Sequence, residues 1–342
     1  MERARWFMAT IRQVANKAGV SIGTVSNVLN GRDERVDPAT KARILESIRE
    51  LRYRPPAFEQ NQSAAVSENL GMIVPDLTER PLSRLGYLQG LLNGALEAAA
   101  LRGWSVTIFA ETMWDDVGNA IRRKYDGRCD AVLVAAPQPK GDLLPSLQRR
   151  GAPIVQIGST PWLEDVSCVD IDNVEAGRLI ARHFKELGHR RMGFISLGQD
   201  HVSGHERWQG FHEIAGDSAI RIVRESNEAF AQQLHDMGDA RPTALLGWHD
   251  GILADIVPAL EDAGLRVPQD VSVAGVDAAK DILEAGFDFT SVENPLQEIG
   301  KLAANMAIDR ALDPNMPSET VRLRPRLIVR SSTAPLMEQV AV

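Results

Sequence analysis

Small polar side chains recur along residues 10–30, where the sequence reads TIRQVANKAGVSIGTVSNVLN. They belong to Thr10, Ser21, Thr24, Ser26, Asn27 and Asn30. Hydroxyl and amide groups of this kind donate hydrogen bonds to phosphate oxygens and so position a protein on a nucleic acid. Asparagine has a second use, because its amide pairs bidentately with the edge of adenine. These residue types make nucleic-acid contact the first chemistry to consider.

Two short helices are expected to carry these side chains. Thr10 and Gln13 fit a capping box, in which the two side chains satisfy backbone N–H groups of the first turn. Gly19 would end the first helix, since glycine enters the left-handed backbone region without steric cost, and Ser21 is suited to cap the second. The apolar residues at helical spacing are Ile11, Val14, Ala15, Ala18, Val25, Val28 and Leu29. The pattern predicts a helix-turn-helix, whose second helix lies in a DNA major groove. A helical hairpin that only packs is the alternative.

A third helix would complete a small N-terminal domain, here named the headpiece. Asp37 is suited to cap this helix and Pro38 to occupy its first position, where the missing N–H is not needed. The expected apolar face comprises Ile44, Leu45, Ile48 and Leu51. Roughly fifty residues is near the lower size limit for an independent core, so the headpiece is expected to be only marginally stable alone.

The first thirty residues resemble the start of the lactose-repressor/galactose-repressor (LacI/GalR) family of bacterial transcription regulators. Its pattern is roughly T-I-x-D-V-A-x-x-A-G-V-S-x-x-T-V-S-R-V-L-N, and here Gln13 replaces the acidic residue and Asn27 the arginine. The resemblance implies that Ile22 and Gly23 lie where the family reads bases. Because glycine has no side chain, specificity would depend on its neighbours. Tyr53 belongs to a Y-x-P that resembles the end of the family headpiece, and is a further DNA-binding candidate.

Residues 56–68 follow as a linker, or hinge. In the LacI/GalR family this segment folds into a short helix on operator DNA, and a leucine near its end is wedged between base steps in the minor groove. Gln62 stands at that position here, while Glu59 replaces an alanine. Glutamine is no apolar wedge, and phosphates repel a carboxylate. This hinge is therefore expected to position the headpieces but to bend DNA little.

Charge is distributed unevenly along the 342-residue chain. Its net charge is −8, yet residues 1–62 contain 11 Lys and Arg against 7 Asp and Glu. A basic N-terminal part on an acidic body would direct phosphate binding to one end of the molecule. With 44% hydrophobic residues the composition is typical of a globular protein.

Targeting and metal signals are missing from the sequence. No apolar run approaches the roughly 20 residues of a membrane span, and the N-terminus lacks the apolar core of a signal peptide. A cytoplasmic location with no membrane partner is therefore expected. Cys129 and Cys168 lack the spacing of metal ligands and are expected to be buried thiols.

From Leu70 onward, short apolar runs alternate with stretches long enough for helices. The expected strands are 70–74, 105–109, 131–135, 154–157, 192–196, 244–247 and 271–276, and the expected helices include 87–102, 176–187 and 252–263. Buried strands joined by helices are typical of parallel sheets covered on both faces. This region is too long for one compact sheet, so two α/β lobes are expected, with a ligand in the cleft at the strand ends.

Later phrases extend the resemblance to residues 9–333. They are LGHRRMGFI at 187–195, RWQGF at 207–211, VPQDVSVAGVD at 267–277 and RLIVRSST at 326–333. The family implies a bilobed periplasmic-binding-protein-like (type I) fold, in which the chain crosses between lobes three times, here near Asp170, Asn294 and Arg324. The implied divisions are a headpiece (9–55), a hinge (56–68), an effector-binding domain (69–333) and a tail (334–342). Its N-lobe would comprise about 69–170 and 295–323, and its C-lobe about 171–294 and 324–333.

The resemblance also implies effector-binding residues. Arg207 and Asp277 match the two positions that most often hydrogen-bond the effector in the family. An arginine fork and a carboxylate suit sugar hydroxyls or a polar ring edge, and an ion pair between surface loops is the alternative. His249 stands where the family has asparagine, although a histidine after an apolar strand is often structural. Trp162 and Trp248 suit stacking on a sugar face or packing in a core.

Three more candidates lie in a segment that enters the cleft in the family. They are Asp76, Arg80 and Arg84. The two arginines replace an asparagine and phenylalanines, which leaves room for an anionic effector such as a sugar phosphate or sugar acid.

Sequence motifs for catalysis are missing: there is no P-loop, HExxH, GxSxG or dinucleotide-binding glycine fingerprint. We therefore expect no enzyme, no catalytic residue, no metal and no cofactor other than a small-molecule effector. The resemblance implies a homodimeric repressor that binds double-stranded operator DNA under the control of a sugar-like effector. Two half-sites multiply the discrimination of one short helix. The alternative is a sugar-binding sensor of the periplasmic type without a DNA-dependent function.

Overall fold

The computed structural model describes most of the chain. The described residues are 9–29, 35–51, 53, 66–74, 86–110, 128–137, 143–149, 153–158, 160–161, 163–196, 202–313 and 315–336. Most of the expected hinge and of the tail lies outside these ranges.

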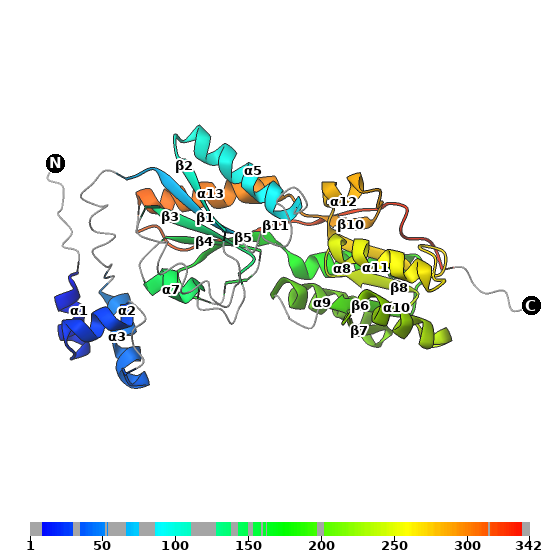
Figure 1. The fold of residues 1–342 in the computed structure, drawn as a ribbon, viewed down its shortest axis with the longest axis horizontal. Helices are drawn as coiled ribbons and strands as arrows, with labels where there is room; N and C mark the ends of the chain where they lie inside the picture. The colour runs from blue at the N-terminus through cyan, green and yellow to red at the C-terminus, as the bar shows by residue number, and fades with distance from the viewer. Residues whose placement is uncertain are drawn as a thin grey trace, which may run out of the picture.

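Three helices form the headpiece around one apolar core (Figure 1). They are α1 (Ile11–Ala18), α2 (Ile22–Leu29) and α3 (Pro38–Glu50). Val14, Val25 and Ile44, one from each helix, are fully buried in that core. Gly19 has a φ of +67°, which permits the sharp turn between α1 and α2. The predicted helix-turn-helix is confirmed.

The first α/β lobe contains a six-stranded sheet. Its strands are β1 (Asn69–Val74), β2 (Ser105–Ala110), β3 (Ala131–Ala135), β4 (Ile154–Ile157), β5 (Ser167–Ile171) and β11 (Thr320–Leu323). They are ordered β11-β5-β4-β3-β1-β2 and pair in parallel. Successive side chains enter opposite cores: Leu70 and Met72 belong to one apolar cluster, and Ile73 belongs to another. Both faces of the sheet are therefore covered.

The second lobe repeats this plan. Its strands are β6 (Met192–Ser196), β7 (Ala219–Val223), β8 (Ala244–Gly247), β9 (Ser272–Asp277), β10 (Thr290–Glu293) and β12 (Arg326–Ile328). They are ordered β12-β10-β9-β8-β6-β7. The pairing of β12 with β10 is antiparallel, and the others are parallel. The predicted two-lobed α/β class is confirmed, with β12 as the departure from uniformly parallel sheets.

Helices cover both faces of each sheet (Figure 1). The first lobe has α5 (Gly86–Leu101), α7 (Leu143–Arg149) and α13 (Leu296–Leu312). The second has α8 (Asn173–Glu186), α9 (Val202–Ala215), α10 (Asn227–Asp236), α11 (Asp250–Asp262), α12 (Lys280–Glu284) and short 3-10 helices at Gly216–Ser218 and Gly238–Ala240. The pair α5 and α13 packs opposite α7, and the pair α8 and α9 packs opposite α10 and α11. Among the described helices, none has the length and apolar character needed to cross a membrane.

Two glycines let α8 and α9 pack backbone against backbone. A Cβ atom on Gly177 would lie 2.0 Å from the backbone oxygen of Arg207, and one on Gly210 would lie 1.8 Å from that of Val174. Any other residue would push the helices apart. This close packing fixes the place of Arg207 in the second lobe.

The chain passes between the lobes three times. After β5 of the first sheet comes α8, which packs on α9 of the second lobe. After β10 comes α13, which returns to the first sheet, and β11 of the first sheet is followed by β12 of the second. The crossings expected near Asp170, Asn294 and Arg324 coincide with these passages.

Candidate functional site

The first turn of α2 presents a partly polar surface to solvent. The backbone N–H of Thr24 donates to Ser21 Oγ at 3.0 Å, and the two hydroxyls lie 2.8 Å apart, so Ser21 caps the helix. Ile22 is 42% exposed, and Gly23 and Asn27 are exposed beside it. One short helix thus exposes an apolar side chain, a glycine without a side chain and an amide side chain.

Hydrogen bonds at the helix starts fix the headpiece around α2. The backbone N–H of Thr10 donates to Gln13 Oε1 at 2.7 Å, and that of Gln13 donates to Thr10 Oγ1 at 3.3 Å, which is the predicted capping box. Asp37 caps α3 by accepting from the N–H of Thr40 at 2.9 Å. Hydrogen bonds from Thr40 hold the pKa of Asp37 below its ordinary value of 3.8.

The DNA-binding candidates differ in accessibility. Thr10, Ser21, Ile22, Gly23 and Asn27 are exposed, and Thr24 and Ser26 are partly buried. Tyr53 is only 3% exposed and packs in the headpiece core. Its ring therefore supports the headpiece from within, and contact between Tyr53 and DNA stays a prediction. Asn30 and Gln62 lie outside the described residues.

Arg207 lies on α9 with its side chain 5% exposed. Its Nε donates to Asn173 Oδ1 at 2.9 Å, and its Nη1 donates to the backbone oxygen of Trp248. Asn173 in turn donates through Nδ2 to Asp170 Oδ2 at 2.6 Å. These contacts fix the plane of the guanidinium, so its orientation does not depend on a ligand.

Asp277 ends β9 with a strained backbone. Its φ is +110° and that of Ala278 is +47°, a region that residues with side chains seldom adopt. Asn294 donates through Nδ2 to Asp277 Oδ1 at 3.1 Å. Burial raises the pKa of Asp277, whereas Arg207 and the Asn294 hydrogen bond lower it. Arg207 is thus close enough to affect this carboxyl electrostatically, so the structure brings the two predicted residues near each other.

Two residues that the sequence analysis did not assign to the site join it. Tyr87 comes from α5 of the first lobe, and burial together with the carboxylates of Asp170 and Asp277 raises the pKa of its phenol. Asp170 lies near the end of β5, and burial raises its pKa to about 6 although Arg207 opposes the shift. The cluster therefore combines side chains from both lobes.

Sequence signals for these two residues existed but were weak. Tyr87 is one of three tyrosines in the chain and opens the expected helix 87–102. Asp170 is an acid inside the otherwise uncharged strand SCVDI. Neither signal predicts that the two side chains lie near Arg207.

Trp248 and His249 lie beside Arg207, but their side chains make contacts within the second lobe. The Trp248 ring packs against its apolar clusters and lies 5.2 Å from the His249 ring, centroid to centroid. His249 caps α11, since its Nδ1 accepts from the backbone N–H of Ile252 at 3.3 Å. One nitrogen of the predicted ligand-contacting ring is therefore occupied by a helix terminus.

Other candidates fall outside the description. Asp76, Arg80, Arg84 and Trp162 are not among the described residues. Cys129 and Cys168 are buried thiols without a disulfide. Within the described ranges, no three His, Cys, Asp or Glu side chains are grouped as metal ligands.

The end of the hinge is tied to the first lobe by one carboxylate. Asp130 Oδ2 accepts from the Ser67 hydroxyl at 2.8 Å and from the backbone N–H of Asn69 at 3.0 Å, while Oδ1 accepts from the N–H of Ser67 at 3.2 Å. Residues 67–69 are therefore fixed to the first lobe through Asp130.

The cluster between the lobes offers a guanidinium, carboxyls, a phenol and amides. It consists of Tyr87, Asp170, Asn173, Arg207, Asp277 and Asn294. Such a set supplies hydrogen-bond donors and acceptors on several sides, which suits a small ligand carrying several hydroxyl groups.

Comparison with known proteins agrees with both halves of this architecture. Residues 10–56 match the lacI family of bacterial regulatory proteins, and residues 181–333 match the periplasmic binding protein-like domain. The HTH-type transcriptional repressor PurR of Photobacterium profundum is 27% identical over 347 residues, covering 96% of this chain and all of the relative.

Solved structures show the same similarity. The complex of the transcriptional regulator CelR with cellobiose shares 27% identity with a TM-score of 0.71, over 95% of this chain and 99% of that one. The lac repressor dimer bound to operator and the anti-inducer ONPF shares 21% identity with a TM-score of 0.66, over 96% of this chain and 100% of that one. The latter likeness concerns the fold.

Proposed function

We propose that this chain, whose residues 10–56 match the lacI family of bacterial regulatory proteins, is a DNA-binding transcriptional repressor controlled by a small-molecule effector. The effector is a sugar or sugar derivative held between the two lobes. The protein acts by binding and not by catalysis, and it works in the bacterial cytoplasm, where its operator is. Its headpiece, hinge, lobes and tail are divided as the sequence predicts.

The observation that carries this proposal is the polar cluster contributed by both lobes. Tyr87 and Asp170 come from the first lobe, and Arg207 and Asp277 come from the second. The carboxylates of Asp170 and Asp277 raise the pKa of Tyr87, and the guanidinium of Arg207 lowers the pKa of both aspartates against the rise caused by burial. A ligand that contacts all four favours one relative orientation of the lobes. Ligand binding and lobe orientation are then coupled by differential contacts, as any effector response requires.

The sugar class is supported by chemistry and by one relative. A planar arginine fork beside carboxylates suits vicinal hydroxyl groups, and CelR, 27% identical, is solved with cellobiose. If the segment with Asp76, Arg80 and Arg84 also faces this site, the arginines extend the choice to anionic sugars.

DNA binding is assigned to the exposed face of α2. Ile22, Gly23 and Asn27 would contact base edges, while Thr10, Ser21, Thr24, Ser26 and Asn30 would contact phosphates. One such helix reads few base pairs, so a homodimer on two half-sites of double-stranded operator DNA is proposed. Movement of the first lobe reaches the headpiece through Asp130 and the hinge. Because Gln62 stands in the hinge where the family has a leucine wedge, the protein is expected to bend the DNA duplex little.

Fluorescence anisotropy tests both halves of this function. The full chain should bind a labelled duplex from its own regulatory region, with an affinity that falls steeply between 50 and 200 mM salt, by roughly 10-fold or more. Deletion of residues 1–62 should abolish DNA binding and leave ribose or cellobiose binding, measured by calorimetry, intact. Binding of no duplex at any salt concentration, with or without sugars, would overturn the proposal.

A further inference from the structure

The turn after β9 is unusual in its backbone. Asp277 and Ala278 both have positive φ, at +110° and +47°, although neither is a glycine. Such a residue is strained and persists only when its surroundings hold it. The contacts that hold this turn therefore decide where the Asp277 carboxylate points.

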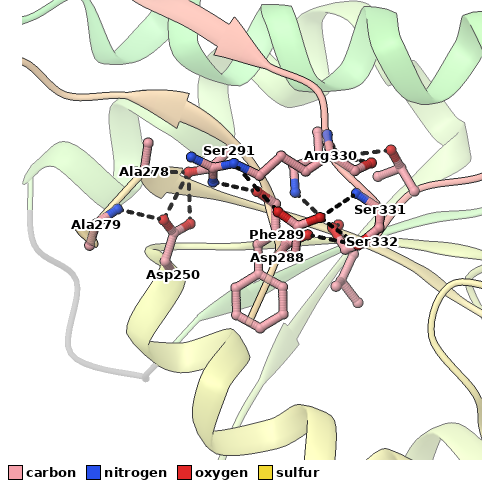
Figure 2. A network of polar contacts seen from close by, with 12 residues as sticks. Asp250, Ala278, Ala279, Asp288, Phe289, Ser291, Arg330, Ser331 and Ser332 are labelled. Atoms are coloured by element: carbon pink, nitrogen blue, oxygen red, sulfur yellow. Dashed lines mark hydrogen bonds and ion pairs between the residues drawn. The ribbon is translucent and has the colours of Figure 1, made fainter. Parts of the chain in front are cut away.

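Two buried side chains hold the turn (Figure 2). The backbone N–H of Ala278 donates to Ser291 Oγ at 3.0 Å, and that of Ala279 donates to Asp250 Oδ2 at 3.2 Å. Ser291 in turn donates to the Asp250 carboxylate, with Oγ 2.8 Å from Oδ1 and 3.0 Å from Oδ2. One carboxylate and one hydroxyl thus bind the two consecutive N–H groups that follow Asp277.

The sheet of the second lobe leaves space for the carboxyl group of Asp250. Gly275 of β9 pairs with Ser291 of β10, and a Cβ atom on Gly275 would lie 2.2 Å from Asp250 Oδ1. The absence of a side chain at Gly275 leaves the space in which Asp250 lies. Asp250, Ser291 and Gly275 therefore form one buried unit beneath the turn.

Helix capping does not explain Asp250. It is the first residue of α11, but the side chain that caps this helix is the preceding His249, whose Nδ1 accepts from Ile252. The carboxylate of Asp250 is engaged by the turn and by β10 instead (Figure 2). Its contacts serve the segment that carries Asp277.

We propose that Asp250 and Ser291 are positioning residues for effector binding, which hold the strained Asp277–Ala279 turn and so aim the Asp277 carboxylate into the cleft. This inference rests on the proposed function, in which Asp277 contacts the effector. It adds Asp250 and Ser291 to the residues on which effector binding depends. Neither contacts the ligand, and both act through the backbone that carries Asp277.

Amide exchange in the full chain without ligand tests the holding of the turn. The Ala279 amide in Asp250→Ala and the Ala278 amide in Ser291→Ala should exchange at least about 10-fold faster, because each loses the acceptor of its hydrogen bond. Residues 272–276 of β9 should keep their protection. Should Asp250→Ala fail to fold, Ser291→Ala, which removes a single hydroxyl, decides the matter.

Asp288→Ala is the matched control. Asp288 lies at the other end of the same network (Figure 2), where its Oδ2 accepts from the Ser331 hydroxyl at 2.7 Å and from the Ser331 N–H at 3.3 Å. Exchange at Ala278 and Ala279 should match the wild type in this variant. Unchanged exchange in Ser291→Ala, or faster exchange across the whole second lobe, would contradict a positioning role.

Calorimetry with ribose and cellobiose tests the consequence for binding. For a sugar that the wild type binds, Ser291→Ala should raise Kd about 10-fold, whereas Asp288→Ala and the operator affinity without sugar should not change. An unchanged Kd in Ser291→Ala would overturn the proposal. If the wild type binds neither sugar, the proposed effector class fails, and the exchange data still decide whether Asp250 and Ser291 hold the turn.

Discussion

Raising the pH from 7 to 9 is expected to destabilise the second lobe through Asp250. Burial raises the pKa of this carboxyl from 3.8 to about 8, with a further rise caused by Asp277, while the hydrogen bond from Ser291 lowers it. In the unfolded chain the pKa returns to its ordinary value. Between these two values the folded protein binds a proton that the unfolded chain does not, so stability falls as the pH rises.

The magnitude follows from the two pKa values. A carboxyl that titrates near 8 when folded and near 4 when unfolded removes roughly 1.4 kcal/mol between pH 7 and pH 9. Asp170, with a pKa of about 6, acts with the same sign but is already ionised in this window. Burial lowers the pKa of His183 and His189, which gives a small effect of opposite sign. When the wild type is compared with an Asp250 variant, the contributions of these other groups to the pH dependence of stability cancel.

Thermal unfolding followed by circular dichroism measures the effect. The wild type should unfold about 3–5 °C lower at pH 9 than at pH 7, and Asp250→Asn, which cannot ionise, should lose most of this difference. Asp288→Asn, an exposed carboxyl in the same lobe, should keep the wild-type dependence. The reasoning is refuted if Asp250→Asn retains the wild-type slope, or if the wild type gains stability over this interval.

Four further perturbations test other parts of the structure. Thr10→Ala removes the α1 cap and should cost about 1 kcal/mol, seen as faster amide exchange in α1. Tyr87→Phe should weaken effector binding about 10-fold without changing operator affinity when no effector is present. A sugar affinity equal to that of the wild type would show that Tyr87 does not belong to the site. Gly210→Ala forces a methyl group against the Val174 oxygen and should cost at least about 2 kcal/mol, lowering Tm. Asp130→Ala should leave sugar binding intact while operator affinity no longer responds to sugar, and an unchanged response would exclude this route.

The strands that could be predicted from the sequence are those made of uninterrupted apolar runs. β1 and β3 contain almost only apolar residues and are buried along their length, which is the pattern of a central parallel strand. β7 and β11 lie at sheet edges, and most of their residues are exposed or only partly buried. β5 is central but is interrupted by Asp170. Short runs of that kind carry little periodic signal.

The candidate site was predictable only where a local motif marks it. Arg207 and Asp277 stand in recognisable phrases, whereas Tyr87 and Asp170 join them through the packing of two lobes that no local pattern describes. Tyr53 shows the converse: a motif predicts that it contacts DNA, and no local pattern indicates that its ring packs in the headpiece core. Burial depends on what a distant helix brings against a side chain, which spacing alone does not specify.

Neither lobe is a continuous stretch of polypeptide. β11 completes an edge of one sheet and β12, a few residues later, completes an edge of the other. A premature stop codon before Thr320 would therefore damage both lobes at once, and no simple truncation releases either as an intact fragment. A single protease cut in one passage, by contrast, yields two polypeptides that stay together, because at least one lobe is packed from segments of both.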